Sequence, residues 1–569
     1  MALRASYDPL PCYPCAAGEV SSGWAGLCAG LPGSAAVLAV DGPAILDWDA
    51  LVTGITTALG VRRLTADVID MRESTAGWEQ TVLRTAPADR LRDDPDFATL
   101  ATGSIADLFD RLPPAPRRAR RLTLVVGPGA ALVDHDLLWY ADLPKRYAEA
   151  GVAAGQGRNL GPPGQAGPPS TRRLFYIDWP LLDRHRDALA PRIDCWVDMR
   201  EPAHPSWLGG PALRASLDAL AGQPFRTRPV FNTTVWGGHW AQAELGLNPG
   251  ARNTALGYEL IAPESGILVG APGGAVVEVP LQVLVALHPA EVLGSHVHEQ
   301  FGTSFPIRFD YLDTVGGGSL SVHCHPRDDD MREVFGWPYA QHETYYVMVG
   351  GEDGLIYLGL RADASVEEFG RCARDADQHG LPFDIERFVQ AFPAAPHQLF
   401  LVPAGTPHGS GAGNVVLEIS ATPYLYSLRF YDWLRRDRDG TQRPVHVEHA
   451  FRNLNRERRG ATVRDDLVQP PRPLASGDGW REELLGALPE MFFQVRRLVL
   501  GPGARAGQRA GDRFHVLNLV EGDGVTIHWP GGAHRLAYAE TIVIPAAVGS
   551  YQLAADGPAP ARVVKAVVG

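Results

Sequence analysis

Hydrophobic positions in the first 205 residues predict alternating strands and helices. AAVLAVDG (35–42) is a continuous apolar run typical of a buried strand, and the DWDALVTGITTAL that follows has helical spacing. RLTLVVGPGA (121–130) repeats this order, while LFYIDWPLLDRHRDAL (174–189) and IDCWVDMRE predict two further strand-rich units. Strand, loop and helix in this succession predict an α/β layer with a parallel sheet over residues 1–205.

From about residue 224 the pattern changes to short strands separated by Gly and Pro turns. GILVGAP, FPIRFDYLDT, SLSVHCHP, TYYVMVG and QLFLVPAG each have the length and alternation of a short strand. We therefore expect a jelly-roll or barrel over residues 224–460, interrupted by a helical insert at about 364–392. After a polar linker (460–478), the hairpin-rich segment 478–569 predicts a second, smaller β-barrel.

Length and charge narrow the classes of protein to consider. A chain of 569 residues is too long for one hydrophobic core and predicts about three domains. The formal net charge is −13, so no global excess of positive charge favours nucleic acid as a partner. The N-terminus has no apolar signal region, and no uninterrupted apolar stretch of about 18 residues occurs, so we expect no membrane partner.

Cysteine usage indicates the compartment. Six cysteines in so long a chain are not typical of a disulfide scaffold. Cys12 and Cys15 form a CxxC pair without a second such pair, which argues against a structural zinc knuckle. We therefore expect a soluble cytoplasmic protein.

The segment SLSVHCHP (319–326) places two imidazoles on one side of a predicted strand. Side chains at positions i and i+2 share a face, so His323 and His325 lie opposite Val322 and Cys324. The two histidine Cα atoms are roughly 6.6 Å apart, a spacing that lets both rings reach one metal ion. The strand thus predicts half of a metal site.

Two further donors follow in the order typical of a cupin. Glu343 begins the strand ETYYVM, and VPAGTPH forms a tight turn that returns His408 toward the barrel. Three imidazoles and a carboxylate suit one zinc ion per chain, with iron or manganese as alternatives. We therefore predict His323, His325, Glu343 and His408 as ligands of one divalent metal ion.

A second HxH pair competes with this prediction. GSHVHEQFG contains His296 and His298 followed by Glu299, but it lacks apolar strand residues on both sides and ends in a Gly turn. We expect these side chains to line the site or the surface rather than to hold the metal.

Several motifs occur in the order seen in class I mannose-6-phosphate isomerases, and the chain resembles that family over about 225–440. The motifs are WGGHW, FPIRFDYLDT, LSVHCHP, ETYYVM, VPAGTPH and LEISATPYLYSLRFYDW. A weaker likeness extends through VEGDG and IPAAVGSY. The resemblance implies a double cupin whose second barrel is metal-free, because Tyr551 stands where a metal-binding cupin carries its turn histidine.

The resemblance also implies the chemistry. It assigns His325, Glu343 and His408 as zinc ligands, and His323 stands where the family has glutamine. The family's catalytic arginine matches Arg429, and a carboxylate near the site matches Glu418. The implied reaction interconverts mannose 6-phosphate and fructose 6-phosphate through an enediolate, with the metal stabilising the developing oxyanion.

Each of the two catalytic candidates has a structural alternative. Arg429 could instead form a salt bridge with Asp432, and Glu418 could be an inward carboxylate paired with an arginine. For Arg308 in FPIRFD we expect an ion pair at the barrel rim rather than a contact with the phosphate.

The first 205 residues have no counterpart in short members of the family. They resemble the kinase-like α/β extension of some longer homologues, yet DGPAILDWDAL lacks the GxxxxGK[ST] phosphate cradle. We expect a structural or regulatory role for them rather than an ATPase.

Two other functions remain open from the sequence. A cupin-type iron oxygenase would use the same ligand set, and a non-catalytic protein could bind sugar phosphates for regulation.

Overall fold

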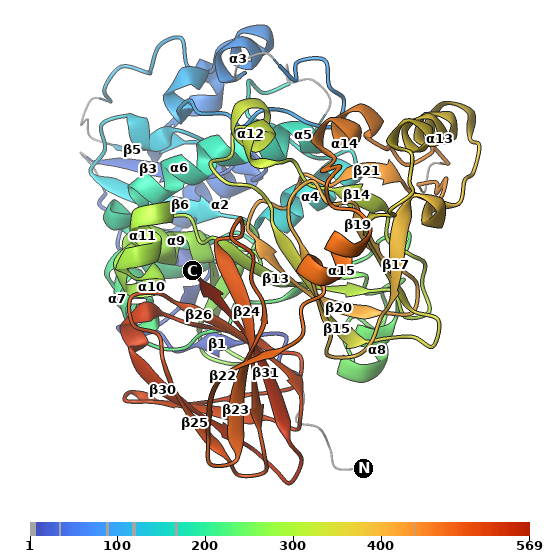
Figure 1. Cartoon of the computed structure of the whole chain (residues 1–569). Coiled ribbons are helices and arrows are strands. Elements are labelled where there is room, and N and C mark those ends of the chain that lie inside the picture. The colour runs from blue at the N-terminus through green and yellow to red at the C-terminus, as the bar shows by residue number, and fades with distance from the viewer. Residues whose placement is uncertain (1–6, 34–35, 87–89, 117–120, 165–168, 438–439) are drawn as a thin grey trace.

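The chain folds into an α/β part and two β-rich parts that pack against one another (Figure 1). The computed structural model describes residues 7–33, 36–86, 90–116, 121–164, 169–437 and 440–569. Figure 1 shows the α/β part at the top, the middle β-sandwich at the right and the C-terminal barrel at the bottom. No helix within these described ranges is long and apolar enough to cross a membrane.

A seven-stranded sheet forms the centre of the α/β part, in the order β2-β8-β7-β6-β3-β5-β4. Neighbours from β4 to β7 pair in parallel, and β8 closes the edge in the antiparallel sense. The strands are β2 (Ser21–Ser22), β3 (Val37–Asp41), β4 (Ala66–Asp70), β5 (Leu122–Val126), β6 (Leu137–Asp142), β7 (Cys195–Asp198) and β8 (Ser206–Gly209). The helices are α1 (Trp24–Ala29), α2 (Trp48–Val61), α3 (Trp78–Thr85), α4 (Lys145–Ala153), α5 (Thr171–Arg173), α6 (Trp179–Leu189) and α7 (Gly210–Ala221).

The segment 174–189 is helical, so the prediction of a strand-rich unit there was wrong. Helix α5, a π-helical turn (Leu174–Asp178) and α6 follow one another without a break. Leu174, Ile177 and Leu181 are buried at helical spacing, which puts them on one face. The aromatic and β-branched residues of LFYI have strand propensity, but packing of this face decides the structure.

Two antiparallel sheets form the middle part, as expected for a jelly-roll. One has the order β18-β15-β20-β13-β10-β9 and the other β17-β16-β19-β14-β21. The first contains β9 (Val230–Asn232), β10 (Leu256–Leu260), β13 (Ile307–Asp313), β15 (Glu343–Val349), β18 (Leu399–Val402) and β20 (Val415–Ala421). The second contains β14 (Val322–Cys324), β16 (Leu355–Leu360), β17 (Val389–Pro393), β19 (His408–Ser410) and β21 (Leu428–Tyr431).

Helices and a small sheet surround this sandwich. The expected helical insert contains α13 (Val366–His379) and then returns as β17. The other helices are α8 (Trp240–Leu245), α9 (Leu281–Leu287), α10 (Pro289–Leu293), α11 (Ser295–Phe301), α12 (Asp328–Asp330), α14 (Val447–Asn453) and α15 (Ala461–Leu467). The small sheet contains β1 (Cys12–Tyr13), β11 (Gly266–Gly270) and β12 (Val276–Pro280).

The C-terminal barrel consists of a six-stranded and a four-stranded sheet. The stretch expected as a linker instead forms α15 and β22, and β22 pairs with β23. The six-stranded sheet holds β22 (Arg472–Gly477), β23 (Trp480–Gly486), β24 (Phe493–Leu500), β26 (His515–Glu521), β29 (Thr541–Ile544) and β31 (Ala561–Val568). The four-stranded sheet holds β25 (Arg505–Arg509), β27 (Val525–Trp529), β28 (Gly532–Leu536) and β30 (Ser550–Ala555).

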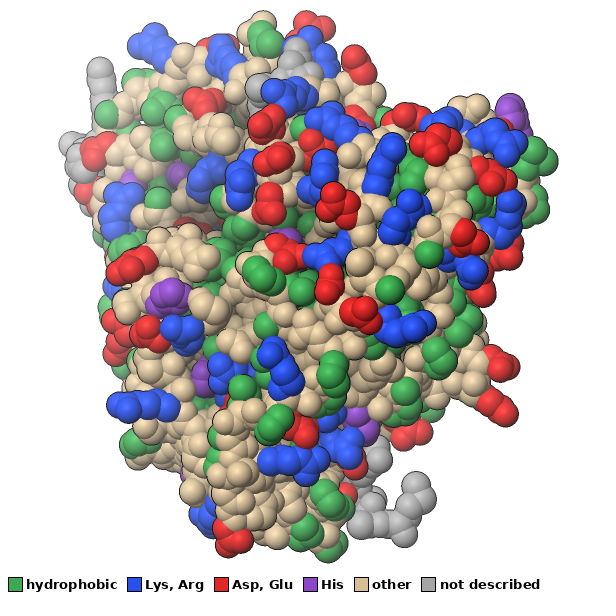
Figure 2. Space-filling view, viewed as in Figure 1, with side chains coloured by type: hydrophobic (Ala, Val, Ile, Leu, Met, Phe, Trp, Pro, Cys, Tyr) green, Lys and Arg blue, Asp and Glu red, His purple; other side chains and the backbone are tan. Residues whose placement is uncertain are grey.

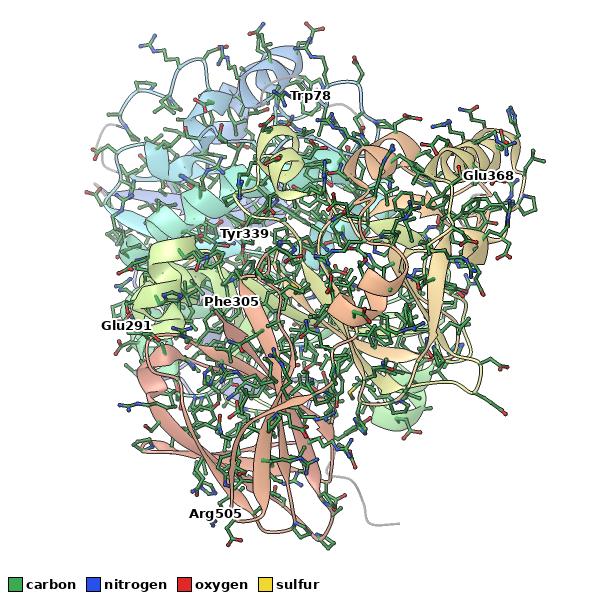
Figure 3. The ribbon with its side chains drawn as sticks, in the orientation of Figure 1. Trp78, Glu291, Phe305, Tyr339, Glu368 and Arg505 are labelled. Carbon is green, nitrogen blue, oxygen red and sulfur yellow. The ribbon has the colours of Figure 1, made fainter. Side chains whose placement is uncertain are left out.

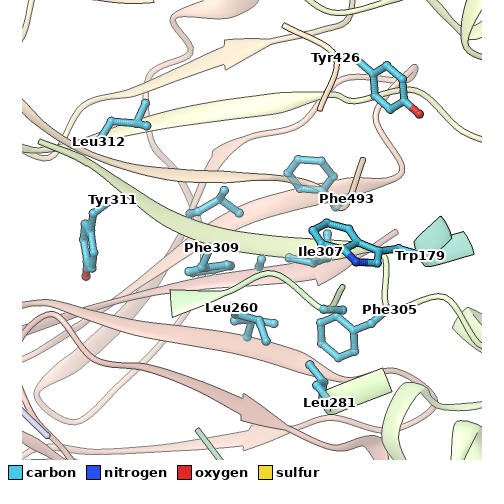
Figure 4. Close-up of a cluster of buried hydrophobic side chains, with 14 of the residues drawn as sticks. Trp179, Leu260, Leu281, Phe305, Ile307, Phe309, Tyr311, Leu312, Tyr426 and Phe493 are labelled. Carbon is cyan, nitrogen blue, oxygen red and sulfur yellow. The ribbon is translucent and has the colours of Figure 1, made fainter. Parts of the chain in front are cut away.

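One buried hydrophobic cluster runs through all three parts. Figure 4 shows Trp179 of the α/β part beside Phe305 and Ile307 of the sandwich, with Phe493 of the barrel in the same cluster. The rings of Phe305 and Phe514 join the middle part to the barrel with centroids 4.4 Å apart. Because burying one such side chain is worth about 1.5–3 kcal/mol, the shared core holds the parts together.

Charged side chains of both signs are interspersed on the face shown in Figure 2. A buried pair, in contrast, joins the middle part to the C-terminal barrel. Arg226 and Glu540 are 2% and 3% exposed at their side chains, and Arg226 Nη1 donates to Glu540 Oε1 at 2.6 Å. The backbone amides of Asp8 and Ala537 also donate to the Glu540 carboxylate, each at 2.8 Å.

Replacement of Glu540 with alanine will leave the Arg226 guanidinium buried without its counter-charge. We expect a loss of about 3–5 kcal/mol in the free energy of unfolding, measured by urea titration. Asp363→Ala, which breaks an exposed pair with Arg361, is the control and should cost less than about 1 kcal/mol. Equal losses in the two variants would contradict the importance of the buried pair.

Candidate functional site

The four predicted metal ligands come together inside the middle part. His323 lies in β14 directly opposite His408 at the start of β19, His325 follows β14, and Glu343 is the first residue of β15. One donor atom from each lies within 4.8 Å of the other three. Donors around a common zinc ion lie roughly 3–4 Å apart, so small adjustments bring all four to one ion.

A hydrogen bond from Nδ1 to a backbone carbonyl fixes the orientation of each of the three imidazole rings. His323 Nδ1 lies 3.0 Å from Ser321 O, His325 Nδ1 3.1 Å from Tyr426 O, and His408 Nδ1 2.9 Å from Thr406 O. A carbonyl oxygen only accepts, so every Nδ1 carries the proton. Every Nε2 therefore presents a lone pair, the arrangement that metal-binding histidines use.

The donor set has unsatisfied buried atoms that a cation would satisfy. His325 Nε2, His408 Nε2 and Glu343 Oε2 are buried without a hydrogen-bond partner among the described residues. The His325 and His408 Nε2 atoms lie 2.9 and 3.2 Å from the Glu343 oxygens. Since an unpaired buried polar group is costly, this cluster fits a divalent metal ion.

Burial also favours the neutral form of His323 and His325. It lowers the pKa of His323 well below 6.5 and lowers that of His325, with His408 adding to the effect in both. Burial acts to raise the pKa of Glu343, but His325, His408 and Arg308 together hold it well below its usual value. Neutral imidazoles and an ionised carboxylate are the forms that bind metal.

Glu418 lies beside this site and is paired with an arginine, as the structural alternative held. Arg308 contacts Glu418, donates to Glu343 Oε1 at 3.1 Å and lies 3.5 Å from Asp310. Burial, together with Asp310 and Glu343, raises the pKa of Glu418 well above its usual value. Arg308 is 5% exposed, so it lies inside the sandwich and not at its rim.

Arg429 lies on β21, paired in register with His323 on β14. Its Nη1 donates to Pro444 O at 3.0 Å, and burial together with Arg443 lowers its pKa. Asp432 is bonded to Arg435 and Arg443 at 3.1 and 2.7 Å, so the expected alternative of an Arg429–Asp432 bridge is not what the structure shows.

The competing histidine pair lies elsewhere. His296 and His298 are on helix α11, where i and i+2 positions point in different directions. The His296 ring bonds to Gly569 O and the His298 ring to Gly302 O. Among the described residues, only the cluster around Glu343 gathers metal donors.

Residues of the α/β part lie directly behind the metal ligands, which the sequence alone did not predict. Tyr426, whose carbonyl holds His325, packs its ring against Phe97 and Tyr176 with centroids 6.5 and 5.6 Å apart. The Tyr176 hydroxyl donates to Leu425 O at 3.1 Å. These contacts join segments more than 200 residues apart, and no local pattern signals them.

Two contacts between histidines and aspartates reinforce this packing. Asp94 Oδ2 lies 2.6 Å from His449 Nε2, and Asp96 Oδ2 lies 3.5 Å from His446 Nε2. The other His446 ring nitrogen lies 3.2 Å from the backbone amide of Arg429. Through His446, the segment 94–97 is thus connected to the backbone of β21 at Arg429.

Comparison with known proteins gives two kinds of similarity. A family model described as a domain of unknown function (DUF8485) matches residues 23–222. A mannose-6-phosphate isomerase from Streptococcus mutans is 24% identical over 346 residues, covering 59% of this chain and 96% of that protein. The probable mannose-6-phosphate isomerase GmuF of Bacillus subtilis is 28% identical over 231 residues, covering 40% of this chain and 67% of that protein.

Solved structures with the same description are also similar. The mannose 6-phosphate isomerase from Bacillus subtilis aligns with a TM-score of 0.48 and 19% identity, covering 60% of this chain and 99% of that chain. A zinc-bound mannose 6-phosphate isomerase aligns with a TM-score of 0.47 and 15% identity, covering 61% and 99%. The match to the Streptococcus mutans protein covers 96% of that protein and 59% of this chain, so this chain has residues beyond the match.

Removal of one imidazole tests the metal site. We expect one zinc ion per chain by elemental mass spectrometry, and a loss of zinc affinity above about a hundredfold in His408→Ala. His323→Gln replaces a ring nitrogen with an amide oxygen, the donor that glutamine supplies at this position in the family that the chain resembles, so the variant should bind zinc within about tenfold of the parent. Unchanged zinc affinity in His408→Ala would refute the ligand assignment.

Proposed function

We propose that the protein is a metal-dependent aldose-ketose isomerase that interconverts mannose 6-phosphate and fructose 6-phosphate. The observation that carries the proposal is the convergence of three imidazole lone pairs and one carboxylate in a buried jelly-roll. The similarity to curated mannose-6-phosphate isomerases supports the same reaction. The expected partner is a small sugar phosphate, and the expected compartment is the cytoplasm.

His323, His325, Glu343 and His408 would hold the metal, and zinc suits a set of three imidazoles and one carboxylate. When bound, a divalent ion supplies Lewis acidity that stabilises negative charge on the sugar oxygens during enolisation. The side chains around it must bind the phosphate, orient the sugar and move one proton between C1 and C2.

Glu418 is our candidate for the group that carries the proton. Its raised pKa favours the protonated carboxyl group, and a general acid–base group must be able to hold a proton and transfer it. Arg308 bridges it to the ligand Glu343, which places the carboxyl group beside the metal site. The same bridge also keeps the buried carboxylates from repelling one another.

Arg429 is our candidate for the cation that faces the substrate. Its place opposite His323 puts it on the strand next to the ligands, and no described carboxylate pairs with its guanidinium. A guanidinium can bind a phosphate or a developing oxyanion through two parallel hydrogen bonds.

We also propose three domains along the chain: a kinase-like domain (1–205), the metal cupin (224–460) and a metal-free cupin (478–569). Parallel strands in the first and antiparallel sheets in the others support this division. The missing GxxxxGK[ST] motif supports a structural or regulatory role for the first domain.

A coupled assay that detects fructose 6-phosphate tests the reaction. We expect turnover of mannose 6-phosphate that a chelator abolishes and added zinc restores, because the metal stabilises the enediolate. Oxygen consumption dependent on iron would instead indicate a cupin oxygenase. Sugar-phosphate binding without turnover would indicate a regulatory protein.

Replacement of Arg429 tests its role in catalysis. Arg429→Ala should lower kcat/KM by about a hundredfold to a thousandfold and leave the zinc content unchanged. Arg436→Ala removes an exposed arginine on the same segment and is the matched control, which should keep full activity. Full activity in Arg429→Ala would remove this residue from the mechanism.

A further inference from the structure

The α/β part contains a cavity of about 560 Å³ that the isomerase reaction does not use. Ala44, Arg72, Leu108, Pro128 and Arg158 are among its lining residues, and it shares no residue with the metal site. The volume lies within the range of small-molecule sites.

The cavity lies where open α/β sheets bind ligands. Ala44 follows β3, Arg72 follows β4 and Pro128 follows β5, so the cavity opens at the carboxyl ends of three parallel strands. From β3 the chain crosses to one edge of the sheet, at β4, and from β5 it crosses to the other side, at β6. Neighbouring strands whose connections leave in opposite directions define the switch point at which ligands bind.

A built-in carboxylate occupies the place where an anionic ligand would bind. Asp41, at the end of β3, is fully buried and accepts the amides of Gly42 and Gly129 at 2.8 and 3.2 Å. Its other oxygen accepts the Ala131 amide and bonds to the His185 ring, both at 2.9 Å. The backbone donors between these strands are thus already satisfied.

The N-terminus of helix α2 and the side chain of Arg72 also have hydrogen-bond partners within the protein. Asp47 caps the 14-residue helix α2 by accepting the Ala50 amide at 3.0 Å. Arg72 donates to Asp49 at 2.9 Å and to Asp70 at 2.6 Å, so its charge is balanced. Among the described lining residues, Arg158 is the one guanidinium without a carboxylate partner, and it is exposed. A phosphate here would therefore meet the three carboxylates of Asp49, Asp70 and Glu73 against this single open cation.

The remaining lining is suited to a ligand that brings its own hydroxyl donors. Asp49, Asp70, Glu73 and Thr75 supply acceptor oxygens on one side. Leu108, Leu160, Pro162 and Pro163 supply apolar surface. Gly161 lies against Trp78 of α3, and a Cβ at this glycine would come within 2.9 Å of the ring. Figure 3 labels Trp78 at the top of the molecule. Glu73 is exposed, and within the described chain we find no ion pair at its carboxylate.

We propose that this cavity binds an uncharged, hydroxyl-rich small molecule, a free sugar or a nucleoside, through vicinal hydroxyl groups. Carboxylates such as Glu73 accept the hydroxyl hydrogens, and charge-assisted bonds of this kind are among the stronger ones. The prolines and leucines pack against the C–H face of a sugar ring or against a base. The proposal does not depend on the isomerase activity.

Calorimetric titration of the zinc-loaded full chain with D-mannose and with adenosine tests the proposal. Comparison of the two titrations shows whether the ligand is a free sugar or a nucleoside. We expect one of them to bind, and adenosine 5′-monophosphate to bind at least about tenfold more weakly than adenosine. Glu73→Gln should weaken binding by about tenfold, since it loses the charged acceptor. Glu79→Gln, an exposed carboxylate on α3 outside the cavity, is the matched control and should bind normally.

Two further variants locate the binding. Ala44→Phe fills the cavity and should abolish binding while leaving isomerase activity intact, whereas His408→Ala should abolish isomerase activity and leave binding intact. The proposal is overturned if neither neutral ligand binds at millimolar concentration, if the monophosphate binds more tightly than the nucleoside, or if binding survives in Ala44→Phe.

Discussion

The metal site depends on hydrogen bonds that hold three imidazole rings in one tautomer. Each ring donates its Nδ1 hydrogen to a backbone carbonyl, which leaves the Nε2 lone pair available to a metal ion. Without these bonds the rings could rotate, and the proton could move from Nδ1 to Nε2. The Nε2 lone pairs beside the buried Glu343 carboxylate would then be lost. The accepting carbonyls belong to Ser321, Tyr426 and Thr406, in segments that directly precede or adjoin the strands of the ligands.

The α/β part is more than an appended domain, because it packs directly behind this site. Phe97 and Tyr176 pack against the ring of Tyr426. Asp94 contacts His449 of α14, and Asp96 contacts His446 directly before that helix. Its own cavity, with the buried Asp41 in the anion position, points to different ligand chemistry from that of the metal site. One chain thus combines a buried cluster of metal donors with a separate cavity in the α/β part.

Local sequence patterns predicted which four donor side chains the structure brings together, and they predicted the short strands of the middle and C-terminal parts. His323 and His325 are two positions apart, so a strand places both side chains on the same face. The turn that positions His408 opposite His323 is also encoded by neighbouring residues. The prediction was wrong at 174–189, where strand-forming residues fold as a helix because the buried face has helical spacing. The Arg308 bridge and the Phe97 contact depend on residues distant in sequence, and no periodicity reports such pairings.

The three imidazoles are not anchored alike. His323 and His408 are held by carbonyls two residues earlier in their own segments, so their anchors move with them. His325 is held by Tyr426, which rests on aromatic rings from the other end of the chain. If the α/β part separated from the middle part, His325 would lose the support of its hydrogen-bond partner, while His323 and His408 would keep theirs. The dissociation rate of the bound metal ion would therefore report on the contact between the two parts.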